Sequence, residues 1–258
     1  MEFSNMKIGF STGSIALDDV CRGIDIAIHD HTNAIELSAL REQELDPLLN
    51  LIGKIRNRLS IFEYISFHAP SKREMFSEEL LVSKLKKVAD LNWAIIVHPD
   101  LIENFELWRT LGRAVCIENM DKRKTTGRTA AQLKYLFDQL PEATFCFDIG
   151  HARQIDPTML EAETMLRDFH YRLRQVHMSY VNSQSHHERL NYECILAYQR
   201  VTQWIDNSIP IILETPVNQN EIDEEISLAK KVFEFVHINH EDDLTPKQHQ
   251  VSIHRSEG

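Results

Sequence analysis

The sequence predicts an α/β fold, a single-domain (β/α)8 TIM barrel. Short apolar segments of strand length alternate with segments whose apolar residues recur at helical spacing, and this unit recurs eight times. The chain has 258 residues, 43% of them hydrophobic, which is the usual size of such a barrel. Nearly every predicted strand also ends in His, Asp or Glu. The strict alternation favours a closed barrel over an open doubly wound sheet.

The amino-terminal half carries four strand-helix units. The first strand ends in the turn residues Ser11, Thr12 and Gly13, and the second helix has a polar start suited to capping at Asp46. The predicted strands are Lys7–Phe10, Ala34–Ser38, Tyr64–Pro70 and Trp93–Pro99, and the predicted helices are Leu17–Ala27, Asp46–Asn57, Leu80–Leu91 and Ile102–Leu111.

The carboxyl-terminal half repeats the pattern, with a polar loop over Asn182–Asn191. We expect residues 1–236 to form the catalytic barrel and residues 237–258, which are rich in His, Asp and Gln, to form a polar tail. The predicted strands are Ala114–Asn119, Thr144–Asp148, Gln175–Ser179 and Pro210–Pro216, and the predicted helices are Thr129–Leu140, Pro157–Phe169, Cys194–Ile205 and Ile222–Phe235.

Charge and cysteine usage limit the classes of partner. A net charge of −11 and a pI near 5.6 give no overall basic footprint for nucleic acid or anionic membrane, although a local patch stays compatible with them. The four cysteines form no CxxC pair, which indicates reduced thiols in a cytoplasmic protein. No signal-peptide or transmembrane pattern is present. We therefore expect a small-molecule substrate and no membrane partner, and a homodimer stays open.

The ends of the strands carry the candidate site. The segment Phe145–Ala152 is an apolar strand that stops at Asp148, Gly150 and His151, and the simpler alternative is that Asp148 only caps the next helix. In a barrel all strand ends meet at one mouth, so their polar residues become neighbours. Several carboxylates buried together need a cation, and mixed carboxylate and imidazole ligands fit Zn, Mn, Fe or Co. The strand-end residues are Glu36, His68, His98, Glu118, Asp148, His177 and Glu214, and His151 lies just beyond.

The motifs Ile117-Glu-Asn-Met120, Phe147-Asp-Ile-Gly-His151, Val176-His177 and Ile212-Leu-Glu-Thr-Pro216 resemble the xylose isomerase-like TIM barrel superfamily. That superfamily includes sugar phosphate isomerases and epimerases and the endonuclease IV-type enzymes (AP endonuclease family 2). The resemblance implies a shared metal site made of Glu118, Asp148, His177 and Glu214. It also implies that His68 and His98, with Glu118 as a bridge, hold a second metal in the endonuclease-like branch, and that His151 binds a third metal or the substrate.

Two departures from the family patterns leave the subfamily open. In the endonuclease-like branch, the loop after the seventh strand supplies an Asp-x-His pair to the third metal. In this chain His186 or His187 could take the place of that histidine, but the aspartate is absent. The epimerase-like branch has an arginine after the strand-seven histidine, and here Ser179 stands in that slot, so that Arg189 is one candidate replacement. We therefore group His151, His186, Glu36 and Arg189 as candidate substrate or additional metal residues.

The expected function is a metal-dependent isomerase or epimerase of a small sugar or keto-sugar. A metal would polarise the substrate, and Glu118 and Glu214 would shuttle the proton, as the resemblance implies. The alternatives are a phosphodiesterase with two or three metals, resembling endonuclease IV, and a dinuclear iron barrel. One to three divalent ions per chain are expected accordingly.

Overall fold

In the computed structural model, which describes residues 6–234, eight parallel strands close into a barrel in the order β1-β10-β7-β6-β5-β4-β3-β2. Each strand is parallel to both neighbours, so all carboxyl ends lie at one mouth. This confirms the predicted fold class. The barrel strands are β1 (Ile8–Ser11), β2 (Ala34–Ser38), β3 (Tyr64–His68), β4 (Ala94–Val97), β5 (Val115–Glu118), β6 (Thr144–Asp148), β7 (Leu173–Met178) and β10 (Ile211–Leu213).

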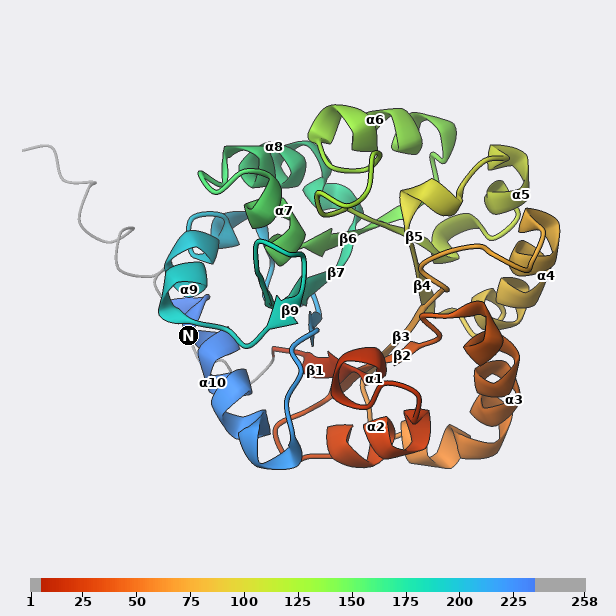
Figure 1. Ribbon diagram of the computed structural model, residues 1–258, viewed down its shortest axis with the longest axis horizontal. Helices are drawn as coiled ribbons and strands as arrows, with labels where there is room; N and C mark the ends of the chain where they lie inside the picture. The colour runs from red at the N-terminus through yellow and green to blue at the C-terminus, as the bar shows by residue number, and fades with distance from the viewer. Residues whose placement is uncertain (1–5, 235–258) are drawn as a thin grey trace, which may run out of the picture.

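Helices surround the barrel on the outside (Figure 1). Their apolar faces pack against the outer faces of the strands, and this layer forms the main hydrophobic core. The helices are α1 (Thr12–Ile15), α2 (Val20–Ala27), α3 (Glu42–Leu59), α4 (Glu78–Ala89), α5 (Phe105–Arg109), α6 (Ala130–Gln139), α7 (Ile149–Ile155), α8 (Leu160–Phe169), α9 (Tyr192–Tyr198) and α10 (Ile222–Lys231). Short 3-10 turns are η2 (Pro99–Leu101), η3 (Gly112–Ala114), η4 (His170–Arg172), η5 (Thr202–Trp204) and η6 (Gln219–Glu221).

Three connections and one helix start differ from the sequence prediction. The connection from β1 to β2 holds α1, over the predicted turn, as well as α2, and α3 begins at Glu42 rather than at Asp46. Instead of one helix, α7 and α8 link β6 to β7, because Asp148 at the strand end accepts a hydrogen bond from the backbone N–H of His151 at 2.7 Å and starts a helix at once. The predicted polar loop after β7 contains a two-stranded hairpin, β8 (Tyr180–Val181) and β9 (His187–Glu188).

The inside of the barrel is polar, which the alternation of the strands explains. Successive side chains point to opposite faces of a strand, so every second residue enters the barrel. Tyr64 of β3 donates a hydrogen bond to Gln175 of β7 at 2.7 Å, which is a contact across the barrel interior. Small and apolar side chains fill the space beside this polar network, and they form a cluster separate from the outer core: Ala94, Ile96, Cys116 and Cys146.

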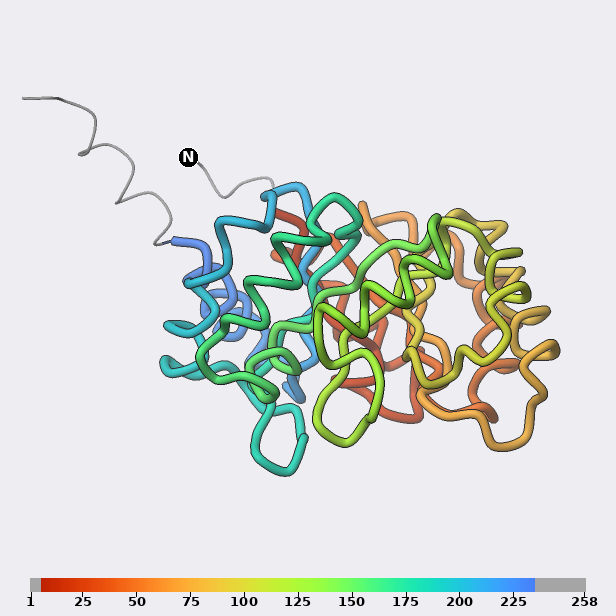
Figure 2. The backbone as a smooth tube through the Cα atoms, turned by 90° about the horizontal axis from the view of Figure 1, so that it is seen from above, coloured from red at the N-terminus to blue at the C-terminus, as the bar shows by residue number. Residues whose placement is uncertain are grey.

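The loops at the mouth project from one end of the barrel. Figure 2 shows that the connection from β5 to α6 and the β8–β9 hairpin extend on the same side of the molecule. Within residues 6–234, no helix combines the length and apolarity that crossing a bilayer demands. The predicted tail, residues 237–258, and the expected domain boundary at 236 lie outside the described residues.

Closure of the barrel depends on close contact between β1 and β2 at Gly9. A Cβ atom at this position would lie 1.6 Å from the carbonyl oxygen of Ala34. We predict that Gly9→Ala lowers the free energy of unfolding by about 3 kcal/mol or more, at the upper end of overpacking costs, as measured by urea denaturation.

Gly53 provides the matched control, because it lies within α3 and a Cβ atom added there would have no neighbour within 4 Å. Gly53→Ala should stabilise the protein by about 0.5–1 kcal/mol, the usual gain from removing a helical glycine. Equal stabilities of the two variants would contradict the close approach of β1 and β2.

Candidate metal centre

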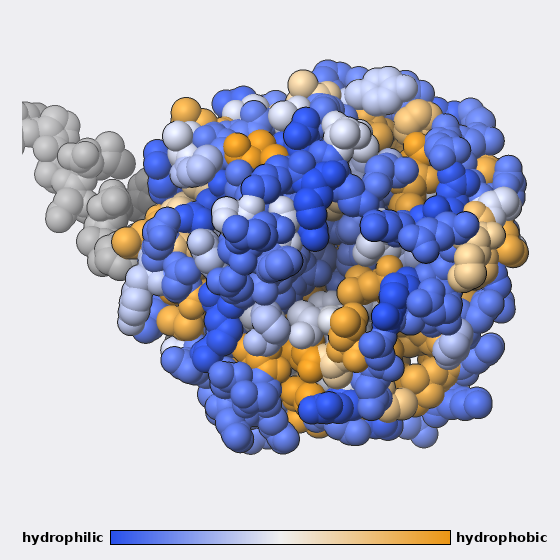
Figure 3. All heavy atoms as spheres, in the orientation of Figure 1, coloured by the Kyte–Doolittle hydropathy of each residue, from blue (hydrophilic) through white to orange (hydrophobic). Residues whose placement is uncertain are grey.

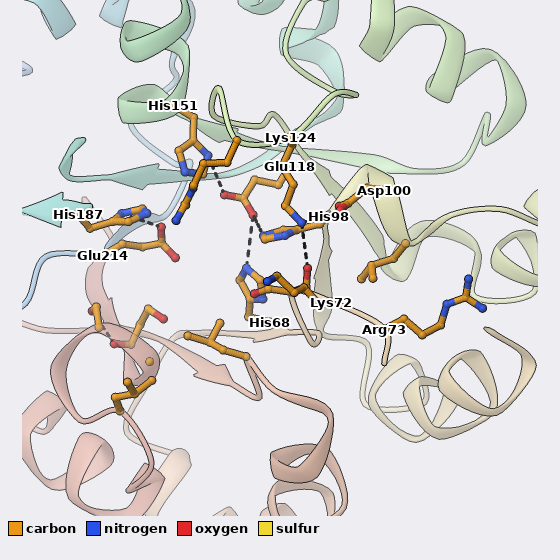
Figure 4. Close-up of a pocket in the computed structure, with 18 of the residues that line it drawn as sticks. His68, Lys72, Arg73, His98, Asp100, Glu118, Lys124, His151, His187 and Glu214 are labelled. Atoms are coloured by element: carbon orange, nitrogen blue, oxygen red, sulfur yellow. Dashed lines mark hydrogen bonds and ion pairs between the residues drawn. The ribbon is translucent and has the colours of Figure 1, made fainter. Parts of the chain in front are cut away.

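The strand ends bring the predicted acids and histidines together at the mouth. Glu118 at the end of β5 stands in the middle, and each of its carboxylate oxygens faces a different set of histidines. Oε2 lies 3.4 Å from Nε2 of His68 and 3.3 Å from Nε2 of His98. Oε1 lies 3.3 Å from Nδ1 of His177 and 3.5 Å from Nδ1 of His151. Figure 4 shows Glu118 between His68 and His98 on one side and His151 on the other.

These contacts define two clusters that share Glu118. One is His68, His98 and Glu118, and the other is Glu118, Asp148, His177 and Glu214; within each, the ligand atoms lie within 4.8 Å of one another. We call them the two-histidine cluster and the four-ligand cluster. Their donors are imidazole nitrogens and carboxylate oxygens, the ligand types that Zn, Mn, Fe and Co accept.

The side chains in these clusters fit divalent cations, because two buried carboxylate oxygens lack a hydrogen-bond donor, and no Lys or Arg balances the acids, among the residues that the structure describes. Oε2 of Glu118 and Oδ2 of Asp148 are buried and have no hydrogen-bond partner in the described part of the chain. Among residues 6–234, no Lys or Arg forms an ion pair with Glu118, Asp148 or Glu214. Burying three carboxylates in this way is costly without a cation.

Burial and the closeness of these carboxylates also shift the pKa values of the metal-free site. Burial, together with the charges of Glu118 and Asp148, raises the pKa of Glu214 to about 7. Burial and the charge of Glu118 raise the pKa of Asp148 to about 6. Burial opposes the charged form of His68, but its close contact with Glu118 and the charges of the nearby carboxylates raise its pKa to about 9. Protons therefore occupy positions that a cation would take.

Local interactions fix the ends of β5, β6 and β7 relative to one another. The side chain of Asn119 donates to the carbonyl oxygen of Asp148 and accepts from its N–H, both at 2.8 Å. Gly150 lets the first turn of α7 approach β7, because a Cβ atom there would lie 2.7 Å from the carbonyl oxygen of Ser179. Asp148 thus caps α7 through Oδ1 and still presents Oδ2 to the four-ligand cluster.

A cavity of about 970 Å³ opens above the clusters, and four of their residues line it: His68, His98, Glu118 and Glu214. Figure 3 shows a hollow near the middle of this face, surrounded mainly by hydrophilic residues. His151 and His187 line the cavity close to Glu118 and Glu214, and Nδ1 of His187 lies 3.5 Å from Glu214. Four cationic side chains also line it: Lys72, Arg73, Arg123 and Lys124.

Three of the predicted additional residues lie outside the cavity lining. His186 is exposed and does not line the cavity, because the hairpin turns its neighbour His187 inward instead. Arg189 points away from the cavity and pairs with Glu221 of η6 and with Glu224 and Glu225 of α10. Glu36 is fully buried below the four-ligand cluster and outside the cavity lining.

Sequence reasoning missed Asp121 and Gln175. Asp121 is buried, and its Oδ2 lies 4.0 Å from Nε2 of His151, but Arg123 pairs with it. Within residues 6–234, Asp121 and His151 do not belong to a third group of side chains close enough to share a metal ion at the mouth.

Gln175 lies two residues before His177 on β7, so the period-two alternation of side chains could have assigned it to the barrel interior. The remaining cluster, His29, His31 and Asp223, lies at the surface.

Several solved structures share the overall fold of this chain. The first is endonuclease IV from Thermus thermophilus, with a TM-score of 0.59 and 19% identity over 88% of this chain and 99% of that one. A candidate sugar phosphate isomerase/epimerase from Anabaena variabilis has a TM-score of 0.61 and 13% identity, over 89% of this chain and 99% of that one. The chain shares the (β/α)8 barrel fold of these two proteins.

A third solved structure agrees with this assignment. A xylose isomerase-like TIM barrel protein from Mycobacterium smegmatis, in complex with magnesium, gives a TM-score of 0.55 and 10% identity over 90% of this chain and 98% of that one. No protein-family model and no curated protein sequence matches the chain. The predicted resemblance is confirmed at the level of the fold.

We predict that metal binding releases protons and tightens as the pH rises. His68, with a pKa of about 9, and part of Glu214, with a pKa of about 7, carry protons at neutral pH, and metal ligands must lose them. Calorimetric titration of the metal-free protein with Zn²⁺, in two buffers of different ionisation enthalpy, counts the protons. An affinity that does not change between about pH 6 and pH 8, with no proton released, would contradict the site.

Proposed function

We propose that this protein is a metal-dependent phosphoester hydrolase in which the two-histidine cluster and the four-ligand cluster, which share Glu118, would each hold a divalent cation. The position of Glu118 is the single observation that carries this proposal. One of its oxygens faces His68 and His98, and the other faces the four-ligand cluster. A carboxylate between two such clusters is the arrangement used by two-metal sites that cleave phosphate esters.

When bound, the two cations would activate a water molecule and neutralise the charge that develops on the phosphoryl group. Side chains of the protein would hold the cations and contact the substrate. Glu118, held between two sets of histidines, fixes the two clusters beside one another. His187 engages Ser179 through Nδ1 at 2.8 Å, which leaves Nε2 available to a phosphoryl oxygen or a leaving group. His151 offers a buried Nε2 that has no partner among the described residues.

The size and charge of the cavity favour a small substrate. Lys124 is paired with Asp100, Arg73 with Glu103 and Arg123 with Asp121, so much of the positive charge at the mouth is already compensated. Lys72 forms no ion pair with any residue in 6–234 and remains to bind an anion. A net charge of −11 disfavours a long polyanion such as duplex DNA. The proposed substrate is therefore a phosphate ester of a small molecule.

An isomerase or epimerase is the second candidate, and one observation favours it. Glu118 and Glu214 both belong to the four-ligand cluster, so two carboxylates lie beside the place of the cation, where they could accept and return a proton. That reaction would need only one cation. Incubation with a panel of ketoses in deuterated water tests it, because proton transfer at carbon would introduce deuterium into the sugar.

His98→Ala separates the two functions. It removes a ligand of the two-histidine cluster and leaves the four-ligand cluster intact. For the hydrolase we predict that bound Zn²⁺ or Mn²⁺ falls from two ions per chain to one. We also predict that kcat/KM for phosphate release from a panel of phosphate esters falls about 100-fold or more, as when one electrostatic stabiliser is lost.

His170→Ala is the matched control, because His170 is exposed in η4, belongs to neither cluster, and its Nδ1 donates to the carbonyl oxygen of Arg167 in α8 at 3.2 Å. Its metal content and activity should equal those of the wild type. A wild-type protein that holds one ion, with deuterium uptake unaffected in His98→Ala, would reject the hydrolase in favour of the isomerase.

A further inference from the structure

A fully buried carboxylate lies inside the barrel beneath the four-ligand cluster. Oε2 of Glu36, on β2, lies 2.9 Å from Nε2 of His177, on the opposite side of the barrel. The same oxygen accepts hydrogen bonds from the amide of Gln175 at 2.8 Å and from the hydroxyl of Ser66 at 3.2 Å. Glu36 contributes no atom to either of the two clusters at the mouth.

The two nitrogens of His177 face different surroundings. Nδ1 points to the cluster, 3.3 Å from Glu118 and 3.5 Å from Glu214, whereas Nε2 points down to Glu36. A neutral imidazole carries its proton on one nitrogen and binds a metal through the other. For Nδ1 to be a ligand, the proton must therefore reside on Nε2.

Glu36 and Gln175 both contact Nε2 of His177, and they favour different positions of the ring proton. The amide nitrogen of Gln175 lies 2.8 Å from Nε2 of His177 and can donate to it, which would move the proton of the ring to Nδ1. Tyr64 donates to Oε1 of Gln175 at 2.7 Å and so keeps the amide NH₂ group facing Glu36 and His177. An ionised carboxylate only accepts hydrogen bonds, so Glu36 requires a proton on Nε2.

We propose that Glu36 is a positioning residue that fixes the Nε2–H tautomer of His177 and aims Nδ1 into the four-ligand cluster, so that metal affinity there depends on a carboxylate that never touches the metal. Outer carboxylates of this kind orient metal-binding histidines and raise their basicity. The inference deepens the proposed function and rests on its metal site. It also replaces the expected role of Glu36 in direct contact with substrate or metal.

Glu36→Gln tests the inference, because the glutamine keeps the shape but can donate to Nε2. In the zinc-loaded protein we expect Zn²⁺ affinity at the four-ligand cluster, measured by competition with a chelator, to fall about 10- to 100-fold. Affinity at the two-histidine cluster should change by less than about twofold. Ser66→Ala is the matched control, since it removes another hydrogen bond to the same oxygen of Glu36 without changing the acceptor, and it should leave both affinities unchanged.

Nitrogen-15 NMR of the zinc-loaded wild type reads the tautomer directly and needs no variant to fold. We expect a proton on Nε2 of His177 and zinc on Nδ1. A proton on Nδ1, or unchanged zinc affinity in Glu36→Gln, would overturn the inference. Both measurements are independent of turnover. Two zinc ions with the expected dependence on Glu36, but no phosphate release, would reject the hydrolase and keep the inference.

Discussion

The structure depends on the burial of three carboxylates, Glu118, Asp148 and Glu214, at one end of a closed barrel. Taking a single carboxylate out of water is costly, and bringing three together adds mutual repulsion. The nearest compensating groups in the described part of the chain are imidazoles rather than Lys or Arg side chains. Because imidazoles are metal ligands, the buried carboxylates and the histidines beside them together form potential binding sites for cations.

The alternation of side chains along each strand organises both the core and the site. Residues such as Leu37, Phe67 and Ile117 face outward and pack in the hydrophobic core. Their neighbours face inward and form a polar column that runs from Tyr64 through Gln175 and Glu36 to His177 and Glu118. The metal centre is the upper end of this column. Its lower members position the ligands from within the barrel.

The strand-end residues could be predicted from the sequence because the closed parallel sheet brings every carboxyl end to the same mouth. His68, His98, Glu118, Asp148, His177 and Glu214 all lie there as expected. From the sequence, helix cap and cluster member are alternative roles for Asp148. The structure allows both because each carboxylate oxygen serves one role.

The remaining positions depended on tertiary structure that no local pattern encodes. Ser185 adopts a left-handed conformation with φ of 63°, and Asn182 closes the β8–β9 turn by bonding to the N–H of His186. The register of this hairpin selects His187 over His186. Arg189 is held away from the mouth by three glutamates of η6 and α10, which lie more than 30 residues away along the chain. The polar column needed the closed barrel before Glu36 could meet His177.

Locating the cations by anomalous scattering, in crystals of the zinc-reconstituted protein, tests the central claim most directly. The account predicts two ions, each bound to a different oxygen of Glu118 at about 2.0–2.2 Å, with His68 and His98 on one and Asp148, His177 and Glu214 on the other. A single ion, or two ions with neither bound to Glu118, would contradict it.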